Sequence, residues 1–180
     1  MKEKDNFLMR VLRERQSIRA YADKQVDPGT IGLLKEALLL SPSSRSIRPW
    51  RFVFVDDRGL LAALSRVKPH GGVFLAKAPL GVVVCGSSDE SDVWIEDCSI
   101  ASTILHLTAH SLGLGSCWIQ IRQRKHESGV PAENVVRDLL DLPPSLHILA
   151  IIAVGYPAGS LERANPPETE FGKVETLSGS

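Results

Sequence analysis

The sequence predicts a single domain in which helices and buried strands pack around one central helix. Its 180 residues, of which 43% are hydrophobic, are enough to bury a large core. The stretch 94–121 reads as one long buried helix that leads directly into a buried strand. Residues 80–85 form a continuous apolar run, which is typical of a strand in a sheet covered on both faces. We therefore expect one domain over 1–180, in which 158–180 is a polar C-terminal tail.

Hydrophobic periodicity, helix caps and turn residues predict the individual elements. Asp27 before Pro28 indicates a helix start, because the carboxylate can cap the helix and proline fits its first turn. Gly113 and Gly115 mark the end of the central helix, where a left-handed cap suits glycine. In chain order we expect helix 4–14, helix 28–40, strand 51–55, helix 60–67, strand 80–85, helix 94–112, strand 116–121, helix 131–140 and strand 147–154.

The central helix is expected to be buried on more than one side. Ile100, Ile104 and Leu107 form one apolar stripe, and Ala101 and Leu105 belong to its neighbour. A helix of roughly twenty residues is about 30 Å long and would cross a small domain. Little of its surface should remain for water, so the rest of the fold should pack around it.

Charge and cysteine content exclude several classes of function. Acidic and basic residues are equal in number, 21 each, so no global charge favours nucleic acid or an acidic membrane. No segment approaches the roughly 18 apolar residues of a membrane span, and the amino terminus lacks a long apolar core. Cys85, Cys98 and Cys117 are widely spaced in apolar segments, so we interpret them as reduced core residues. We expect a cytoplasmic protein that binds neither nucleic acid nor membrane.

The segment 15–19 has the spacing Arg-x-Ser-x-Arg. In an extended segment Arg15, Ser17 and Arg19 share one side, because side chains alternate with a period of two. Two guanidinium groups and a hydroxyl that converge on one point make a good phosphate site. A solvated basic turn is the alternative, and these five residues alone do not separate the two.

Motifs for metal, hydrolytic and phosphoryl-transfer chemistry are incomplete. His106 and His110 have the spacing of two zinc ligands, but Leu107 stands where a zinc peptidase has glutamate, and no third ligand is evident. The Gly-Leu-Gly at 113–115 lacks the third glycine of a dinucleotide fingerprint. No nucleophile elbow and no phosphate loop ending in Gly-Lys-Ser/Thr is present. We therefore expect no metal, and this pattern is compatible with a protein whose organic cofactor carries the chemistry.

The order of several segments resembles the nitroreductase family of flavin enzymes. The segments that carry the resemblance are RQSIRAY, SPSSRSIRPWRF, APLGVVV, EDCSIASTILHLTAHSLGLGSCWI and ILAIIAVGYP, which together extend from about Phe7 to Pro157. The resemblance implies an α+β fold with a central mixed, mainly antiparallel sheet flanked by helices. It also implies an intertwined homodimer that holds FMN at the subunit interface.

The resemblance assigns expected roles to the positions that match the family's motifs. The segment 15–19 matches the phosphate-binding motif, with Gln16 at the position that approaches the flavin. Residues 42–44 match a loop that reaches the flavin from the second subunit, and the backbone of 117–120 matches the segment along the isoalloxazine ring. The expected cofactor-binding residues are Arg15, Gln16, Ser17, Arg19, Pro42, Ser43, Ser44, Ser46, Cys117, Trp118, Ile119, Gln120 and Arg163.

The sequence departs from the family pattern at two places, the loop that contains residues 42–44 and the C-terminal tail. Ser46 and Arg48 stand where many members have asparagine and glutamine. The lysine–arginine pair in the tails of many members has no clear match after Pro157, and Arg163 is the nearest candidate.

The expected function is that of an FMN-dependent NAD(P)H oxidoreductase. It would take hydride from NAD(P)H and reduce nitroaromatic, quinone or related small acceptors by a ping-pong mechanism, with no catalytic side chain because the flavin carries the chemistry. The alternative is a flavin-binding carrier or sensor with little turnover. Rapid reduction of bound flavin by a nicotinamide would favour the enzyme, and stable oxidised flavin in excess donor would favour the carrier.

Overall fold

The computed structural model describes residues 6–159 and 169–177. Short 3-10 turns η2 (Ser44–Ser46), η3 (Val73–Lys77) and η4 (Phe171–Lys173) lie between or after the main elements. The α-helices and strands, in chain order, are α1 (Phe7–Glu14), α2 (Pro28–Leu39), β1 (Trp50–Val55), α3 (Arg58–Leu64), β2 (Leu80–Ser87), α4 (Trp94–Ser111), β3 (Gly115–Gln120), α5 (Ala132–Leu139) and β4 (Leu146–Gly155).

These strands form a four-stranded sheet of order β1-β2-β4-β3, in which every neighbouring pair is antiparallel. All residues of β2 are buried, as the continuous apolar run predicts. The expected mixed character is represented, among the described residues, by an isolated parallel bridge between Ser17 and Ser116. The predicted α+β fold with a mainly antiparallel sheet is thus confirmed.

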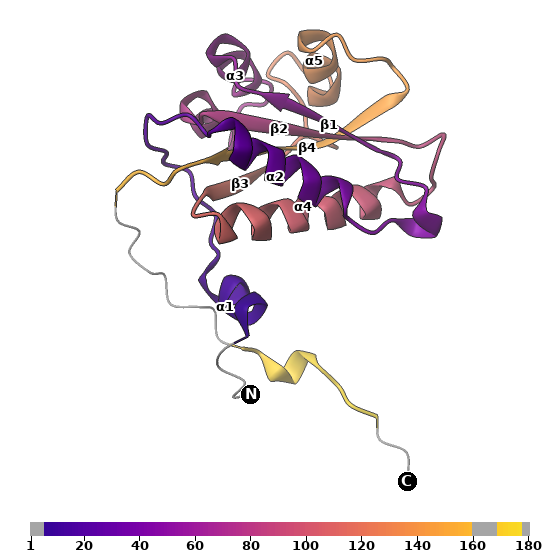
Figure 1. The fold of residues 1–180 in the computed structure, drawn as a ribbon. Helices are drawn as coiled ribbons and strands as arrows, with labels where there is room; N and C mark the ends of the chain where they lie inside the picture. Colours follow the sequence, from indigo (N-terminus) through magenta and orange to yellow (C-terminus); the bar gives the residue numbers. More distant parts are fainter. Residues whose placement is uncertain (1–5, 160–168, 178–180) are drawn as a thin grey trace.

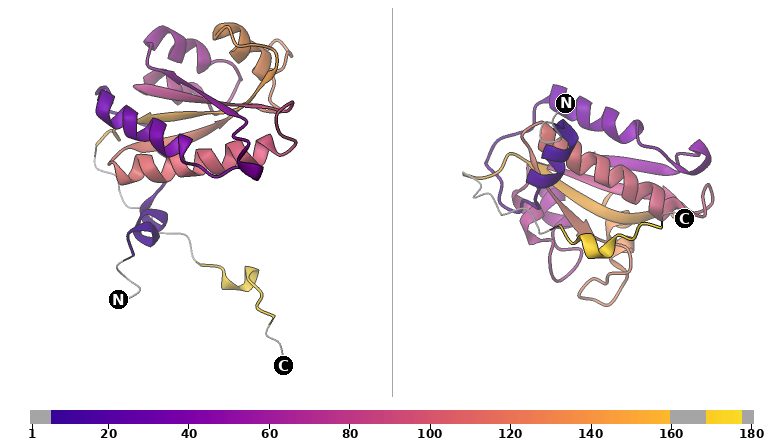
Figure 2. Two further views of the ribbon diagram at one scale, coloured as in Figure 1. Left: turned by 45° about the vertical axis from the view of Figure 1, so that its right-hand side comes forward. Right: turned by 90° about the horizontal axis from the view of Figure 1, so that it is seen from below.

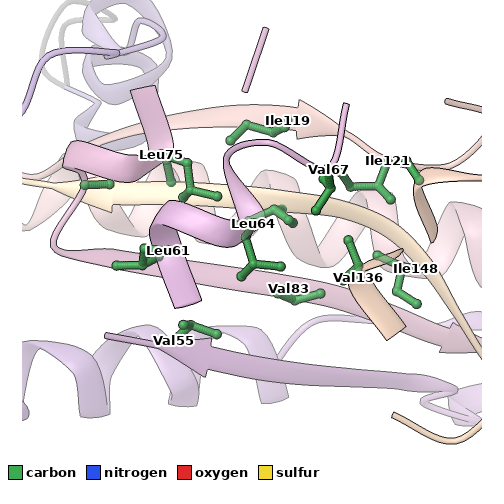
Figure 3. Close-up of a cluster of buried hydrophobic side chains, with 14 of the residues drawn as sticks. Val55, Leu61, Leu64, Val67, Leu75, Val83, Ile119, Ile121, Val136 and Ile148 are labelled. Carbon is green, nitrogen blue, oxygen red and sulfur yellow. The ribbon is translucent and has the colours of Figure 1, made fainter. Parts of the chain in front are cut away.

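Helices cover both faces of this sheet (Figures 1 and 2), with α2 and α4 on one face and α3 and α5 on the other. Each face has its own apolar cluster, because strand side chains alternate between the two sides. In Figure 3, Leu61 and Leu64 from α3 and Val136 from α5 meet Val83 of β2 and Ile148 of β4. The other face packs against the buried side of α4.

The bounds of the central helix α4 and of the strand β3 are close to the predicted ones. Gly113 and Gly115, which lie where the helix leads into the strand, each have a physical reason to be glycine. Gly113 has φ 75°, the left-handed conformation expected after a helix. Gly115 is required for a different reason, since a Cβ there would lie 2.5 Å from Ile18. The expectation that little of α4 faces water is wrong at Ile100, which is 43% exposed. The stripe that contains Ile100 does not face the sheet, so no residue in the described ranges covers it fully.

Two further differences from the predicted elements come from caps. Helix α3 begins at Arg58 rather than residue 60, because Asp57 accepts a hydrogen bond from Leu60 N–H at 2.7 Å. Helix α1 begins at Phe7, where the Asn6 side chain accepts from Met9 N–H at 3.1 Å. Within the described residues, no helix combines the length and apolarity that crossing a membrane requires.

Candidate functional site

The segment that follows α1 lies along the start of β3. Ile18 N–H donates to the carbonyl of Ser116 at 3.0 Å, next to the parallel Ser17–Ser116 bridge. Ile18 is buried, whereas Ser17 and Arg19 on either side of it are exposed. The segment is therefore extended with the predicted period of two. Its polar side chains lie at the free edge of the sheet, where the order of strands leaves β3 without a full neighbour.

Ser17, Arg19 and Lys68 surround the thiol of Cys117. Burial raises the pKa of the Cys117 thiol, whereas the Arg19 guanidinium, a hydrogen bond with Ser17 and the Lys68 ammonium each act to lower it. Burial also lowers the pKa of Lys68, and the nearby Arg124 guanidinium adds to that effect. Positive charge from three segments distant in the sequence thus gathers beside the start of β3.

Arg15 lies on the α4 side of the same edge, beside His106. Burial, followed by the charge of Arg15, lowers the pKa of His106 to about 4. The ring therefore stays neutral near pH 7, and its Nδ1 is 2.7 Å from the hydroxyl oxygen of Ser116. His110 has a separate contact with Glu14, at 3.8 Å. Among the described residues, no three potential metal ligands gather into one group.

The cations beside β3 fit a phosphate group. Within the described ranges, Arg15, Arg19 and Lys68 form no ion pair, whereas the exposed Arg58 is paired with Asp23. Like charges that gather without a counter-ion repel one another, so a bound anion would stabilise them. The guanidinium groups, the ammonium and the Ser17 hydroxyl form a donor set that suits the dianionic phosphate of FMN. We refer below to Arg15, Ser17, Arg19 and Lys68 as the cationic clamp.

The free edge of β3 also offers backbone donors. The carbonyl of Ser116 points away from β4, since it accepts from Ile18. In an antiparallel pair, the backbone N–H and C=O groups of one residue point to the same side. The N–H and C=O groups of Trp118 and Gln120 therefore also point away from β4. Ile119 is buried as a whole residue, and its backbone groups face β4, so it presents no group at the free edge. The Trp118 indole donates to Gln120 at 2.9 Å, which fixes both side chains beside this edge.

The loop after α2 is held by contacts with its own residues and with α4. Ser44 N–H donates to Asp97 Oδ1 at 2.8 Å, and Arg48 N–H donates to the Ser43 hydroxyl at 3.0 Å. Pro42 is exposed, and Ser43 and Ser44 are half-buried. We refer below to residues 42–48 as the serine loop.

One chain does not bring the serine loop and the cationic clamp together. The loop contacts α4 at Asp97, whereas Arg15 of the clamp lies close enough to His106 for its charge to act on that ring. Nine residues of α-helix separate these positions, a distance of about 13 Å along the axis. In Figure 1 the loop meets one end of α4, and the segment after α1 reaches the other.

Sequence reasoning missed two residues at these positions, Lys68 and Asp97. Lys68 follows α3 in a turn, and no local pattern relates that turn to β3. Asp97 offered a signal, because its spacing of four and eight residues places it on the helix face of Ala101 and Leu105, which are buried. Another predicted site residue, Arg163, lies outside the described residues.

The fold and the clamp define an α+β protein with a cationic edge on its sheet. A family model described as the nitroreductase family matches residues 12–70 and 64–156. The chain is also 34% identical, over 157 residues, to a protein of Methanothermobacter thermautotrophicus that is provisionally named NADH dehydrogenase/NAD(P)H nitroreductase. That alignment spans 84% of this chain and 78% of the relative.

Two further comparisons agree with this match. A relative from Archaeoglobus fulgidus with the same provisional name is 31% identical over 153 residues, which span 83% of this chain and 84% of the relative. A solved structure described as an FMN-dependent nitroreductase from Clostridium difficile R20291 is 38% identical and has a TM-score of 0.89. It covers 94% of this chain and 98% of that chain. The chain belongs to the nitroreductase family, as the sequence resemblance predicts.

Proposed function

We propose that the protein is an FMN-dependent NAD(P)H oxidoreductase that reduces small acceptors such as nitroaromatics or quinones by a ping-pong mechanism. The observation that carries the proposal is the cationic clamp, whose arginines and lysine have no ion-pair partner among the described residues. The names of the relatives support the same chemistry, since they include NAD(P)H nitroreductases and an FMN-dependent nitroreductase.

The clamp residues would hold the phosphate of FMN, and the edge of β3 would hold its ring. When bound, FMN would supply the two-electron chemistry that no side chain of this protein provides. Arg15 and Arg19 would donate charge-assisted hydrogen bonds, the Ser17 hydroxyl a neutral one, and Lys68 a further positive charge. Gln16 is half-buried beside Arg15, at a position from which it would approach the ring.

The protein's own contribution to the reaction would be electrostatic and positional. Backbone N–H groups of Trp118 and Gln120, preorganised on a strand edge, would stabilise negative charge that develops beside them. Cys117 is nearly fully buried, and burial raises the pKa of its thiol, so we assign it no nucleophilic role. Trp118 would shape the surface on which an acceptor stacks.

We further propose that the working protein is a homodimer in which each serine loop completes the other subunit's site. Large apolar side chains stay exposed on one chain, notably Phe7 and Leu8 of α1, Ile100 of α4, and Phe171 and Leu177 of the tail. Figures 1 and 2 show α1 and residues 169–177 on the side of α4 that faces away from the sheet. Exposed apolar surface of this kind is typical of a subunit interface.

The spectrum of the purified protein is the first test, because bound FMN makes a protein yellow. The second is anaerobic stopped flow, in which the protein is mixed separately with NADH and NADPH, followed by an acceptor. Rapid bleaching by one donor and rapid recovery with a quinone or nitroaromatic are expected of the enzyme. Oxidised flavin that persists in excess of both donors would instead support a flavin carrier or sensor. Protein that neither retains nor rebinds FMN would overturn both assignments.

A further inference from the structure

Asp97 is a buried carboxylate in the first turn of α4, only 2% exposed. Its Oδ1 accepts from Ser44 N–H at 2.8 Å, and its Oδ2 is 3.4 Å from the Ser91 hydroxyl. Among the described residues, no lysine, arginine or histidine pairs with it. Removing a carboxylate from water without a cation is costly, although the positive end of the helix dipole offsets part of that cost. Because the Asp97 carboxylate is buried despite this cost, we infer that its hydrogen bond with Ser44 of the loop has a role in the protein.

The serine loop that Asp97 contacts has a strained backbone. Arg45, Ser46 and Arg48 have φ values of 51°, 55° and 58°, in the left-handed region that disfavours residues other than glycine. Such strain persists only where the surroundings over-determine the conformation, and it gathers at functional sites. Within the described residues the loop is held by Ser44 N–H to Asp97, by Arg48 N–H to the Ser43 hydroxyl, and by an exposed ion pair of Arg45 with Asp92. Two backbone hydrogen bonds within the loop, Ser46 N–H to the Ser43 carbonyl and Ile47 N–H to the Ser44 carbonyl, add to these.

Of these contacts, the hydrogen bond to Asp97 has the properties of an anchor. It joins the loop backbone to a buried group on the longest helix of the described chain, whereas the Arg45–Asp92 pair is largely exposed and contributes little. The hydrogen bonds to Ser43 and the backbone bond from Ile47 to Ser44 lie within the loop and cannot place it relative to the fold. The acceptor is also a carboxylate, which makes the hydrogen bond stronger than one between neutral groups.

We propose that Asp97 is a positioning residue, which fixes the serine loop in the shape that completes the flavin site of the partner subunit. The inference rests on the proposed function, because it takes the loop to reach the flavin across a dimer. Asp97 itself touches neither cofactor nor substrate in this account. It acts through the backbone of Ser44, and its effect appears in the subunit that does not carry it.

FMN affinity of refolded full-length apoprotein, measured by the quenching of flavin fluorescence, is the first readout. Asp97→Ala should weaken FMN binding about 10-fold to 100-fold, the equivalent of one charge-assisted hydrogen bond. Asp97→Asn keeps an acceptor oxygen and should restore affinity to within roughly 5-fold of wild type. Ser102→Ala is the matched control, since Ser102 is also buried on α4 but bonds only to the carbonyl of Cys98. An Asp97→Ala protein that binds FMN within about 2-fold of wild type would overturn the inference.

Mixed dimers separate positioning of the partner's site from a structural role within one subunit. Two differently tagged chains are combined, and bound FMN is counted at a concentration that fills only intact sites. With Asp97→Ala on one chain and Arg19→Ala on the other, one site should have a wild-type clamp and a wild-type loop, giving one FMN per dimer. With both substitutions on one chain and a wild-type partner, each site has one defect, so no FMN should bind.

A role confined to the subunit that carries Asp97 predicts the reverse pattern. The separated substitutions would then damage both sites, and the combined ones would leave the wild-type subunit's site intact. That reversal would contradict the inference while the FMN assignment stands. Equal FMN binding by wild type and Arg19→Ala would instead remove the proposed function, and the inference with it. The count also remains informative if Asp97→Ala alone assembles poorly, because Asp97→Leu or Ser44→Pro can replace it as the loop defect.

Discussion

The two ends of α4 carry proposed binding surfaces of different kinds. Near His106 lies the cationic clamp, whose charged side chains have no ion-pair partner among the described residues. Near Asp97 lies the serine loop, in which strained backbone is held by a buried carboxylate. The first supplies charge, which contributes affinity for an anion, and the second supplies shape. One chain holds the two about 13 Å apart along the helix, and in the proposed dimer the loop of one chain would meet the clamp of the other.

The largest effect is expected where two chains would bring these ends together. Ile100→Asp places a charge on the exposed apolar stripe of α4, and a twofold interface would bury it twice, weakening the dimer by several kcal/mol. The protein should become monomeric at micromolar concentration and lose FMN at the same time, as sedimentation velocity and flavin absorbance can show. Val130→Asp is the control, because Val130 is 44% exposed and Ile100 is 43% exposed. A dimer that survives Ile100→Asp would exclude this face of α4 from the interface.

A second effect, on the pH dependence of stability, is expected only at the end of α4 that lies near the clamp. The pKa of His106 is about 4 in the folded protein, below its usual 6.5, so below pH 6.5 the unfolded chain binds a proton more readily. Stability should therefore fall as the pH drops from 6.5 towards 4, by about 3 kcal/mol in total. Urea unfolding of the apoprotein over this range should show a steeper loss for wild type than for His106→Gln. Parallel curves for the two proteins would contradict the neutral, buried histidine.

The clamp can also be weakened without a change in the loop. Arg19→Ala should weaken FMN binding by about 1.5 to 3 kcal/mol, since it removes a charge-assisted hydrogen bond to phosphate. Riboflavin has no phosphate, so its affinity should change little. Titrations of both flavins, with Arg58→Ala as a surface control, measure the difference. Equal losses for the two flavins would show that Arg19 contacts the ring rather than the phosphate.

The smallest effect is expected at the Cys117 thiol, which lies in the clamp but is not assigned to the reaction. Cys117→Ala should retain flavin reduction by the nicotinamide within about 3-fold, whereas loss of a catalytic acid or base costs at least about 100-fold. Separate half-reactions measured by stopped flow in the FMN-bound variant provide the test. In Trp118→Ala, the acceptor half-reaction should change more than reduction of the flavin. A 100-fold slower flavin reduction in Cys117→Ala would give the thiol a role in catalysis.

Local patterns predicted most of the fold because its elements have strong local signals. The apolar run at β2 and the cap at Asp27 were correctly assigned, and Gly113 has the left-handed conformation that a helix end requires. The bounds of α3 were displaced because Asp57 was not recognised as its cap. The exposure of Ile100 was missed because periodicity identifies an apolar face but not what covers it.

The candidate site was predictable in part. The alternation around Ile18 follows from sequence, and the resemblance to a family supplied the roles expected of Arg19 and Ser44. The approach of Lys68 to Cys117 depends on how a turn after α3 folds back onto β3, which no local spacing encodes. The distance between clamp and loop is likewise a property of the packed chain. Only the structure shows that the two lie at opposite ends of one helix.

The central claim is that each flavin site is built from two chains. Sedimentation velocity of the FMN-bound protein over a dilution series, recorded at both flavin and protein absorbance, tests it most directly. Mass action links the two equilibria, because only the dimer offers the whole site. We predict that flavin sediments only with the dimer and becomes free as monomer appears. A monomer that sediments with stoichiometric FMN at micromolar concentration would contradict the claim.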